Sequence, residues 1–341
     1  NPLTEALVES LLRAPPGVRL RVLRLTGTGI GEAGAILLGE VPGLEGLQEL
    51  DLGQNHLGAR AVASLACSRV LTQLERLDLS GNDIDVDAAE ALASTLRLTG
   101  LRSLSLADNP LTAHGARHLA RSRRLISLRE LDLSSTQLGD KGIWALARSK
   151  CLGGLAQIRL DHNQVSAKGA ELLAEARSLR PRRLSLARNQ LGNRGVRTLA
   201  GATSLSSLTH LDLAGNGIGP VGVESLAETV CLLRLASLSL DDNPIGDVGA
   251  QTLVDSPVVA RVRQLALVNT ALTNESAHVI ASSHYLRALE ELEIEGNRIA
   301  EGGVRAIVQS PGLPALRWLD VEARLLAPRS ATPLDTPRAR T

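Results

Sequence analysis

The chain has 341 residues, a hydrophobic content of 44% and a formal net charge of +1. A sizeable core is therefore possible, and the overall charge gives no electrostatic indication of nucleic-acid or anionic-membrane binding. With two Trp, one Tyr and no Phe, the core has to be aliphatic. No apolar run is long enough to form a membrane-spanning helix.

Residues 1–19 precede the regular part of the chain. Within them, residues 2–13 (PLTEALVESLLR) place Leu3, Leu7 and Leu11 at helical spacing. This pattern predicts an N-terminal capping helix, which covers the first strand of the array that follows.

Residues 20–326 form a repeat array of eleven full repeats and one partial repeat. The first leucine, or its equivalent, recurs every 27 residues, except for one step of 26 between Leu155 and Pro181. We number the positions of each repeat from this residue. The starts are Leu20, Leu47, Leu74, Leu101, Leu128, Leu155, Pro181, Leu208, Leu235, Val262, Leu289 and Leu316.

Each repeat combines two periods. Apolar and polar residues alternate in its first part, as in Leu50, Asp51 and Leu52, which predicts a short strand. The second part has helical spacing, as in Ala116, Leu119 and Ala120.

Three positions carry structural signals. Position nine is usually Asn, with Thr28, Thr136 and Thr270 as substitutes, and we expect stacked copies to form a hydrogen-bond ladder. Position twelve has mostly N-cap residue types and predicts the helix start. Glycine at position fifteen, as in Gly115, is expected to let the helix approach its strand.

Residues 208–227 (LTHLDLAGNGIGPVGVESLA) show the full pattern LxxLxLxxNxIGxxGAxxLA. This pattern resembles the ribonuclease-inhibitor-like class of leucine-rich repeats, and its even spacing is most similar to bacterial members. The resemblance implies an α/β solenoid shaped as a horseshoe, with a parallel sheet on the concave face and helices on the convex face. Members mostly bind proteins. The vertebrate inhibitor differs because it is rich in Cys and alternates two repeat lengths, so specificity for ribonucleases is not implied.

The C-terminal strands carry a predicted acidic cluster on the concave face. Like charges fall in register at Glu293 and Asp320 and again at Glu295 and Glu322, while Glu290 and Glu291 add charge with only Arg317 nearby. Trp318 lies within this cluster, either as an anchor for a basic partner or as a cap on the last strand. A calcium site is weakly supported, since no loop has calcium-ligand spacing. A second pair of like charges, Asp51 and Asp78, has Arg76 nearby to relieve it.

Two further groups are candidate contacts. Arginines gather around the 26-residue step, where Pro181 is expected to disturb the sheet, and they either face an acidic partner or form a solvated charge run. They are Arg159, Arg177, Arg180, Arg182, Arg183 and Arg188. Trp144, at a helix position that is polar in most repeats, is expected to be exposed on the convex side. It either contacts a partner or lies flat over Arg117 and Glu171.

No catalytic or metal motif is recognised. His114 and His118 have metal-capable spacing, but HGARH lacks the glutamate of a zinc hydrolase, and the expected neighbours Asp87 and Lys141 do not complete a site. Neither a resident metal nor a cofactor is predicted, and we do not expect an enzyme.

The three cysteines, Cys67, Cys151 and Cys231, form neither a CxxC pair nor a disulfide framework. We expect half-buried free thiols in a reducing, cytoplasmic compartment. The chain begins at Asn1 without an initiator Met, so a removed signal peptide or a longer parent protein stays possible.

The favoured function is a non-catalytic scaffold that binds a protein on its concave face, with neither nucleic acid nor membrane as partner. One alternative, suggested by a relative of this repeat class, is a GTPase-activating protein with Arg188 or Arg298 projecting from a loop. Another is a structural, self-assembling repeat. Residues 327–341 are predicted to be disordered, which leaves the last strand uncovered and open to end-to-end contact.

Overall fold

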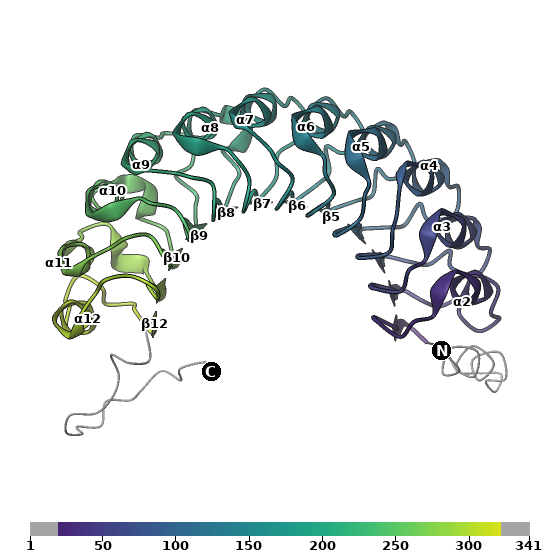
Figure 1. Ribbon diagram of the computed structural model, residues 1–341, viewed down its shortest axis with the longest axis horizontal. Coiled ribbons are helices and arrows are strands. Elements are labelled where there is room, and N and C mark those ends of the chain that lie inside the picture. The colour runs from purple at the N-terminus through teal and green to yellow at the C-terminus, as the bar shows by residue number, and fades with distance from the viewer. Residues whose placement is uncertain (1–19, 322–341) are drawn as a thin grey trace, which may run out of the picture. The chain divides into compact units, whose positions relative to one another are not determined.

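The computed structural model describes residues 20–321, which fall into two compact units (Figure 1). Unit 1 comprises residues 20–164 and 176–181, and unit 2 comprises residues 165–175 and 182–321. The predicted capping helix, Glu322 and the predicted tail lie outside the described residues.

Unit 1 alternates short parallel strands with helices, and its strands hydrogen-bond in chain order. Partner residues lie one repeat apart, as Val22 and Glu49 do. The elements are β1 (Val22–Arg24), α2 (Gly31–Leu38), β2 (Glu49–Asp51), α3 (Gly58–Cys67), β3 (Arg76–Asp78), α4 (Val86–Ser94), β4 (Ser103–Ser105), α5 (Thr112–Arg121), β5 (Glu130–Asp132), α6 (Gly139–Ala147) and β6 (Gln157–Arg159).

Unit 2 has the same organisation, with short 3-10 turns after three of its helices. Its elements are α7 (Ala167–Ala174), β7 (Arg183–Ser185), α8 (Gly192–Ala200), η1 (Thr203–Leu205), β8 (His210–Asp212), α9 (Pro220–Ala227), β9 (Ser237–Ser239), α10 (Gly246–Val254), η2 (Pro257–Val259), β10 (Gln264–Ala266), α11 (Asn274–Ser282), η3 (Leu286–Ala288), β11 (Glu291–Glu293), α12 (Glu301–Val308) and β12 (Trp318–Asp320).

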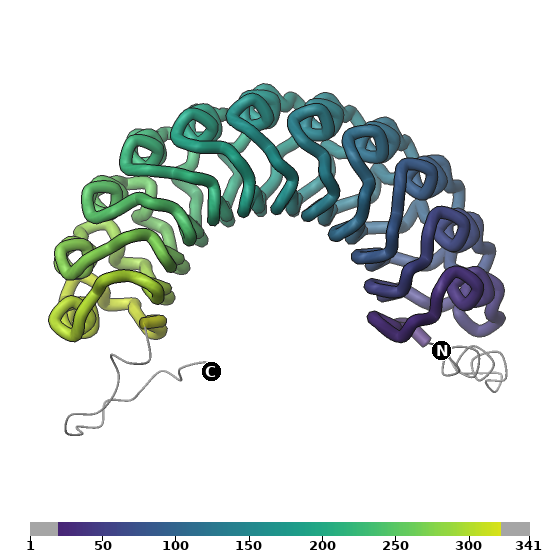
Figure 2. Tube along the Cα trace, viewed as in Figure 1, coloured from purple at the N-terminus to yellow at the C-terminus, as the bar shows by residue number. Residues whose placement is uncertain are grey.

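Each unit has a strand side and a helix side, with the apolar core between them (Figures 1 and 2). The middle residue of a strand points into this core: Leu50 and Leu77 are almost completely buried. Burying such a side chain stabilises the fold by about 1.5–3 kcal/mol. Since every repeat contributes the same positions, each layer stabilises the next one.

The position-nine ladder is confirmed. The backbone N–H of Asn55 donates to Oδ1 of Asn82 at 2.8 Å, and Nδ2 of Asn82 donates to the carbonyl of Leu52 at 2.9 Å. Both asparagines are buried. Thr136 replaces part of this arrangement, because its hydroxyl donates to the carbonyl of Leu133 at 2.5 Å. The asparagines therefore satisfy backbone groups that would otherwise be buried without partners.

Helices begin at position twelve or thirteen, close to the predicted start. Asp85, Ser166 and Thr273 accept hydrogen bonds from the first helical N–H groups, as N-caps do. Glycines such as Gly58 do not act as caps. Gly58 is itself the first helical residue, with φ of +66°, a conformation that glycine adopts without strain.

Glycine at position fifteen was predicted to let the helix approach its strand, and this prediction was wrong about which segment the helix approaches. A Cβ on Gly115 would lie 2.6 Å from Cγ of Leu111 and 3.3 Å from Cβ of Ala89 on the neighbouring helix. Glycine here lets α5 approach its own loop and α4, rather than its strand.

All three cysteines are free, as predicted. Cys151 and Cys231 are partly buried, but the expectation of a half-buried thiol was wrong for Cys67, which is exposed. Pro181 ends the second segment of unit 1 and Arg182 begins the second segment of unit 2, while β7 pairs with β8 in the usual register. Between residues 20 and 321, no helix has the length and apolar character needed to cross a membrane.

Candidate binding surfaces

The first and last residues of every strand, at positions three and five, point away from the core. We call the surface that they form within a unit its strand face. Register pairing brings equivalent side chains together, since adjacent parallel strands lie about 4.8 Å apart.

All three arginines on the strand face of unit 1 form lateral ion pairs. Glu49 lies between Arg24 at 2.6 Å and Arg76 at 3.4 Å. Asp132 pairs with Arg159 at 3.5 Å. These pairs neutralise Glu49 and Asp132, whereas Asp51, Asp78 and Glu130 make no ion pair in the described chain.

The expected relief of Asp51 and Asp78 by Arg76 was wrong. These two aspartates are in register, but Arg76 turns to Glu49. Asp51 instead accepts a hydrogen bond from the hydroxyl of Thr26 at 2.6 Å. Asp78 accepts one from the N–H of Ser80 at 2.9 Å.

The strand face of unit 2 begins at an end that carries one cation, Arg183, and one carboxylate, Asp212, which stands in register with Ser185. Arg183 on β7 stands in register with His210 on β8. Burial lowers the pKa of His210, and the charge of Arg183 lowers it further. His210 is therefore neutral at neutral pH, while Arg183 is charged and makes no ion pair with any residue between 20 and 321.

The middle of this face is small and nearly neutral. β9 presents Ser237 and Ser239, and β10 presents Gln264 and Ala266. A partner can approach the backbone closely at these two strands.

The far end is acidic. Glu291 stands in register with Trp318, and Glu293 with Asp320. Trp318 is half-buried on the strand face, so the structure places it among the carboxylates as predicted. Glu295 follows β11 and is exposed.

Two local partners moderate the acidic end. Arg263 pairs with Glu290 at 3.1 Å, which corrects the expectation that Arg317 is the only cation nearby. Nε2 of Gln264 donates to Glu291 at 3.0 Å but leaves its charge intact. Within the described range, no group of three His, Cys, Asp or Glu residues is arranged to hold a metal ion.

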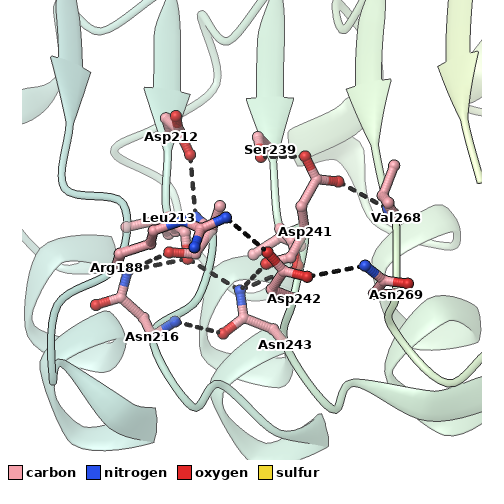
Figure 3. A network of polar contacts seen from close by, with 12 residues as sticks. Arg188, Asp212, Leu213, Asn216, Ser239, Asp241, Asp242, Asn243, Val268 and Asn269 are labelled. Atoms are coloured by element: carbon pink, nitrogen blue, oxygen red, sulfur yellow. Dashed lines mark hydrogen bonds and ion pairs between the residues drawn. The ribbon is translucent and has the colours of Figure 1, made fainter. Parts of the chain in front are cut away.

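The loops that follow the strands of unit 2 contain a polar network that the sequence did not indicate (Figure 3). Arg188 pairs with Asp242 at 3.5 Å, and Nδ2 of Asn269 donates to the same carboxylate at 3.0 Å. All three residues occupy position eight, so reading that position along the array could have found the network.

Asp241 lies beside this network and is half-buried. It accepts hydrogen bonds from the N–H of Val268 at 2.7 Å and from the hydroxyl of Ser239 at 3.1 Å. Burial nevertheless raises the pKa of Asp241, and the nearby charges of Asp212 and Asp242 act in the same direction.

The predicted arginine group is divided between the units. Arg159, Arg177 and Arg180 belong to unit 1, and Arg182, Arg183 and Arg188 to unit 2. Three of them have local partners: Arg159 pairs with Asp132, Arg180 donates to the carbonyls of Ala176 and Leu179, and Arg188 pairs with Asp242. Of the group, Arg183 is the strand-face cation of unit 2 that is left without an ion pair in the described chain.

Trp144 is exposed on the helix side of unit 1, as predicted, with 40% of its surface accessible. The cation over its ring is Arg148, whose Cζ lies 5.3 Å from the ring centroid. The expected stacking over Arg117 and Glu171 was wrong. Glu171, in unit 2, instead binds Lys168 at 2.7 Å and Arg194 at 2.8 Å.

Comparison with known proteins agrees with this architecture. A leucine-rich-repeat family model matches residues 70–93, 124–147, 182–200, 204–227 and 235–254. A search of curated protein sequences finds no significant match.

Several solved structures are similar in fold. An internalin (inlF) from Listeria monocytogenes has a TM-score of 0.53 at 17% identity, with 95% of this chain and 91% of that chain covered. The yeast Rad7 and Elc1 complex gives a TM-score of 0.61 at 17% identity, covering 94% and 79%. The TLR13–ssRNA13 complex gives 0.51 at 21% identity, covering 89% of this chain and 41% of that chain. At these identities the similarity concerns the fold alone. The matched repeats and the strand–helix architecture together show that the chain has the fold of a leucine-rich-repeat solenoid.

Proposed function

We propose that this protein is a non-catalytic interaction scaffold that binds a protein partner on the strand face of unit 2. The observation that carries the proposal is the polarity of that face. One end carries Arg183, which makes no ion pair in the described chain, and Asp212. The side chains of β9 and β10 are uncharged, and the other end carries Trp318 with carboxylates. A partner of complementary charge would fit it in one orientation.

The contrast with unit 1 supports this choice. The strand face of unit 1 pairs Arg24 and Arg76 with Glu49 and pairs Asp132 with Arg159. A partner that uses these arginines first has to displace the carboxylates that already pair with them. The half-buried Trp318 adds an aromatic anchor to unit 2, a residue type that is enriched among binding hot spots.

The comparisons are consistent with a binding role and leave the class of partner open. The similar structures include a complex of two proteins, Rad7 and Elc1, and a complex with single-stranded RNA, TLR13. We favour a protein, because the net charge of the chain is only +1. We also propose that the repeats are of the ribonuclease-inhibitor-like, bacterial type and that the protein acts in the cytoplasm, as its free cysteines suggest.

GTPase activation is less well supported. An arginine finger has to be free to enter a partner's site. Arg188 is engaged with Asp242, whereas Arg298 is exposed in its loop. A GTPase-stimulation assay with an Arg298→Ala control decides this alternative.

The proposal is tested by affinity capture from a lysate of the cells that produce the protein, with quantitative mass spectrometry. The double variant Arg183→Ala/Trp318→Ala removes an arginine and an apolar side chain from the unit 2 face. The matched control Val22→Ala/Arg24→Ala removes the same kinds of group from β1 of unit 1. We expect one protein to be enriched by the parent and the control and lost by the double variant. Equal enrichment by all three chains places the binding surface elsewhere.

A further inference from the structure

The helix side of unit 1 contains a pocket of about 370 Å³ between α5 and α6. These two helices are neighbours in the array (Figure 1). Residues of both helices and of the loops that follow them line it, and we call it the α5–α6 pocket. Its charged lining residues are Arg117, Arg121, Arg123, Arg148 and Lys150.

The charge of this pocket is one-sided. No Asp or Glu lines it, and its five cationic side chains are all exposed. None of the five forms an ion pair with any residue in the described part of the chain. Like charges held close together repel, so the arrangement favours an anion. The net charge of +1 for the whole chain makes this local excess distinctive.

Favourable interactions with the helix dipole explain only part of this excess of cationic side chains. Cations at the C-terminal end of a helix interact favourably with its dipole, which accounts for Arg121 at the end of α5 and Arg148 just after α6. Arg117 lies a turn earlier, and Arg123 and Lys150 lie in the loops beyond the helices. Their convergence on the same pocket requires another reason.

Trp144 forms an apolar wall of the pocket. Arg148 lies over its ring at 5.3 Å, a cation–π contact that holds the guanidinium at the pocket wall. A guanidinium fixed in this way loses less conformational freedom when it binds an anion.

We propose that the α5–α6 pocket binds the anionic side chains of an acidic peptide segment, either carboxylates or phosphoserine. This rests on the proposed role as a protein-interaction scaffold and adds a second contact surface to it. The guanidinium fork matches both anions, and arginine clusters are a common mode of recognising acidic and phosphorylated motifs.

A peptide fits the pocket better than a nucleic acid does. Single-stranded nucleic acids bind along successive aromatic platforms. Trp144 is the pocket's one aromatic residue, and Arg148 lies over its ring. The chain's other aromatic residues, Tyr285 and Trp318, belong to unit 2.

The test is fluorescence anisotropy with the full chain and three labelled probes: a glutamate-rich peptide, the same peptide with phosphoserines, and a single-stranded oligonucleotide. The variant Arg121→Glu/Arg148→Glu is compared with Arg261→Glu/Arg287→Glu, which makes the same charge change at exposed arginines of unit 2. Thermal unfolding checks that both variants are folded. We expect the peptide that the parent binds more tightly to bind the pocket variant at least about tenfold more weakly, while the control variant binds it like the parent.

A site-specific readout accompanies the binding curves. In a Trp318→Phe background Trp144 is the chain's only tryptophan, and we expect the peptide to change its emission. Binding without such a change, equal losses in both charge variants, or absence of peptide binding would overturn the proposal. Tighter, pocket-dependent binding of the oligonucleotide would also overturn it. The proposed function fails independently, because its capture experiment uses strand-face variants and leaves this pocket intact.

Discussion

Arg188 forms an ion pair with Asp242, two repeats further along the array (Figure 3), and its side chain passes beside Gly215. A Cβ on Gly215 would lie 3.1 Å from Cγ of Arg188. The missing side chain therefore leaves room for the arginine to cross the intervening loop.

This ion pair predicts a small coupling energy. The two side chains are 59% and 39% exposed, so we expect about 0.2–1 kcal/mol between Arg188→Ala and Asp242→Ala, decreasing with added salt. A double-mutant cycle by chemical denaturation measures it. The same cycle in a Gly215→Ala background should give a smaller value, since alanine at φ of +61° is strained and crowds Arg188. If the effects of Arg188→Ala and Asp242→Ala on the free energy of unfolding are additive at low salt, the ion pair is contradicted.

The asparagine ladder predicts a larger effect. Asn82→Ala removes the acceptor for the N–H of Asn55 and the donor to the carbonyl of Leu52. The carbonyl of Leu52 keeps a hydrogen bond from Nδ2 of Asn55 at 2.9 Å, so the N–H of Asn55 is the group left unsatisfied. The free energy of unfolding should therefore fall by about 1–3 kcal/mol.

Asn82→Thr is the matched control, because the chain itself uses Thr136 and Thr270 at this position. The hydroxyl of Thr136 bonds the carbonyl of Leu133, so threonine should retain part of the stability. Equal losses for alanine and threonine in urea denaturation would show that the hydrogen bonds are not the cause.

Two helical glycines should respond oppositely to alanine. Alanine at Gly115 would bring its Cβ within 2.6 Å of Leu111, so crowding should cost about 1–3 kcal/mol. Nothing lies within 4 Å of a Cβ at Gly302 in α12, so alanine there should stabilise the helix by up to about 1 kcal/mol. Thermal unfolding of the two variants gives the sign of each stability change. Changes of the same sign in both variants would refute the packing argument.

Asp241 predicts a pH dependence. Because burial raises its pKa above the ordinary aspartate value of 3.8, the folded protein holds this proton more tightly than the unfolded chain does. Its contribution is most favourable below pH 3.8 and is lost as the pH rises through the folded pKa. Asp241→Asn should therefore be more stable relative to the parent at neutral pH than at acidic pH. Urea denaturation at both values tests this, and a difference independent of pH would contradict it.

The sequence predicted the features that depend on a single repeat position. Leu50 is buried and Asp51 is not because neighbouring residues of a strand face opposite sides, and the role of Asn82 follows from its own donor and acceptor. These features repeat with the array, and position nine, for example, is Asn in eight repeats and Thr in three, so many copies support each prediction.

The partners of long charged side chains could not be predicted in the same way. Arg76 has three carboxylates nearby: Glu49 and Asp51 on the adjacent strand β2, and Asp78 on its own strand β3. Which carboxylate it pairs with depends on the rotamers of all four side chains. Arg148 contacts Trp144 from the helix end, which the comparison of equivalent positions did not reveal. The candidate surfaces follow from such choices, because they determine which charges remain for a partner.

The central claim is that a protein partner covers the strand face of unit 2. Hydroxyl-radical footprinting of the captured complex tests it most directly, since Trp318 and His210 are oxidisable side chains on that face and Tyr285 lies outside it, just before η3. Our account predicts that partner binding slows oxidation of Trp318 and His210 and leaves Tyr285 unchanged. Unchanged oxidation of Trp318 and His210 in a saturated complex would contradict it.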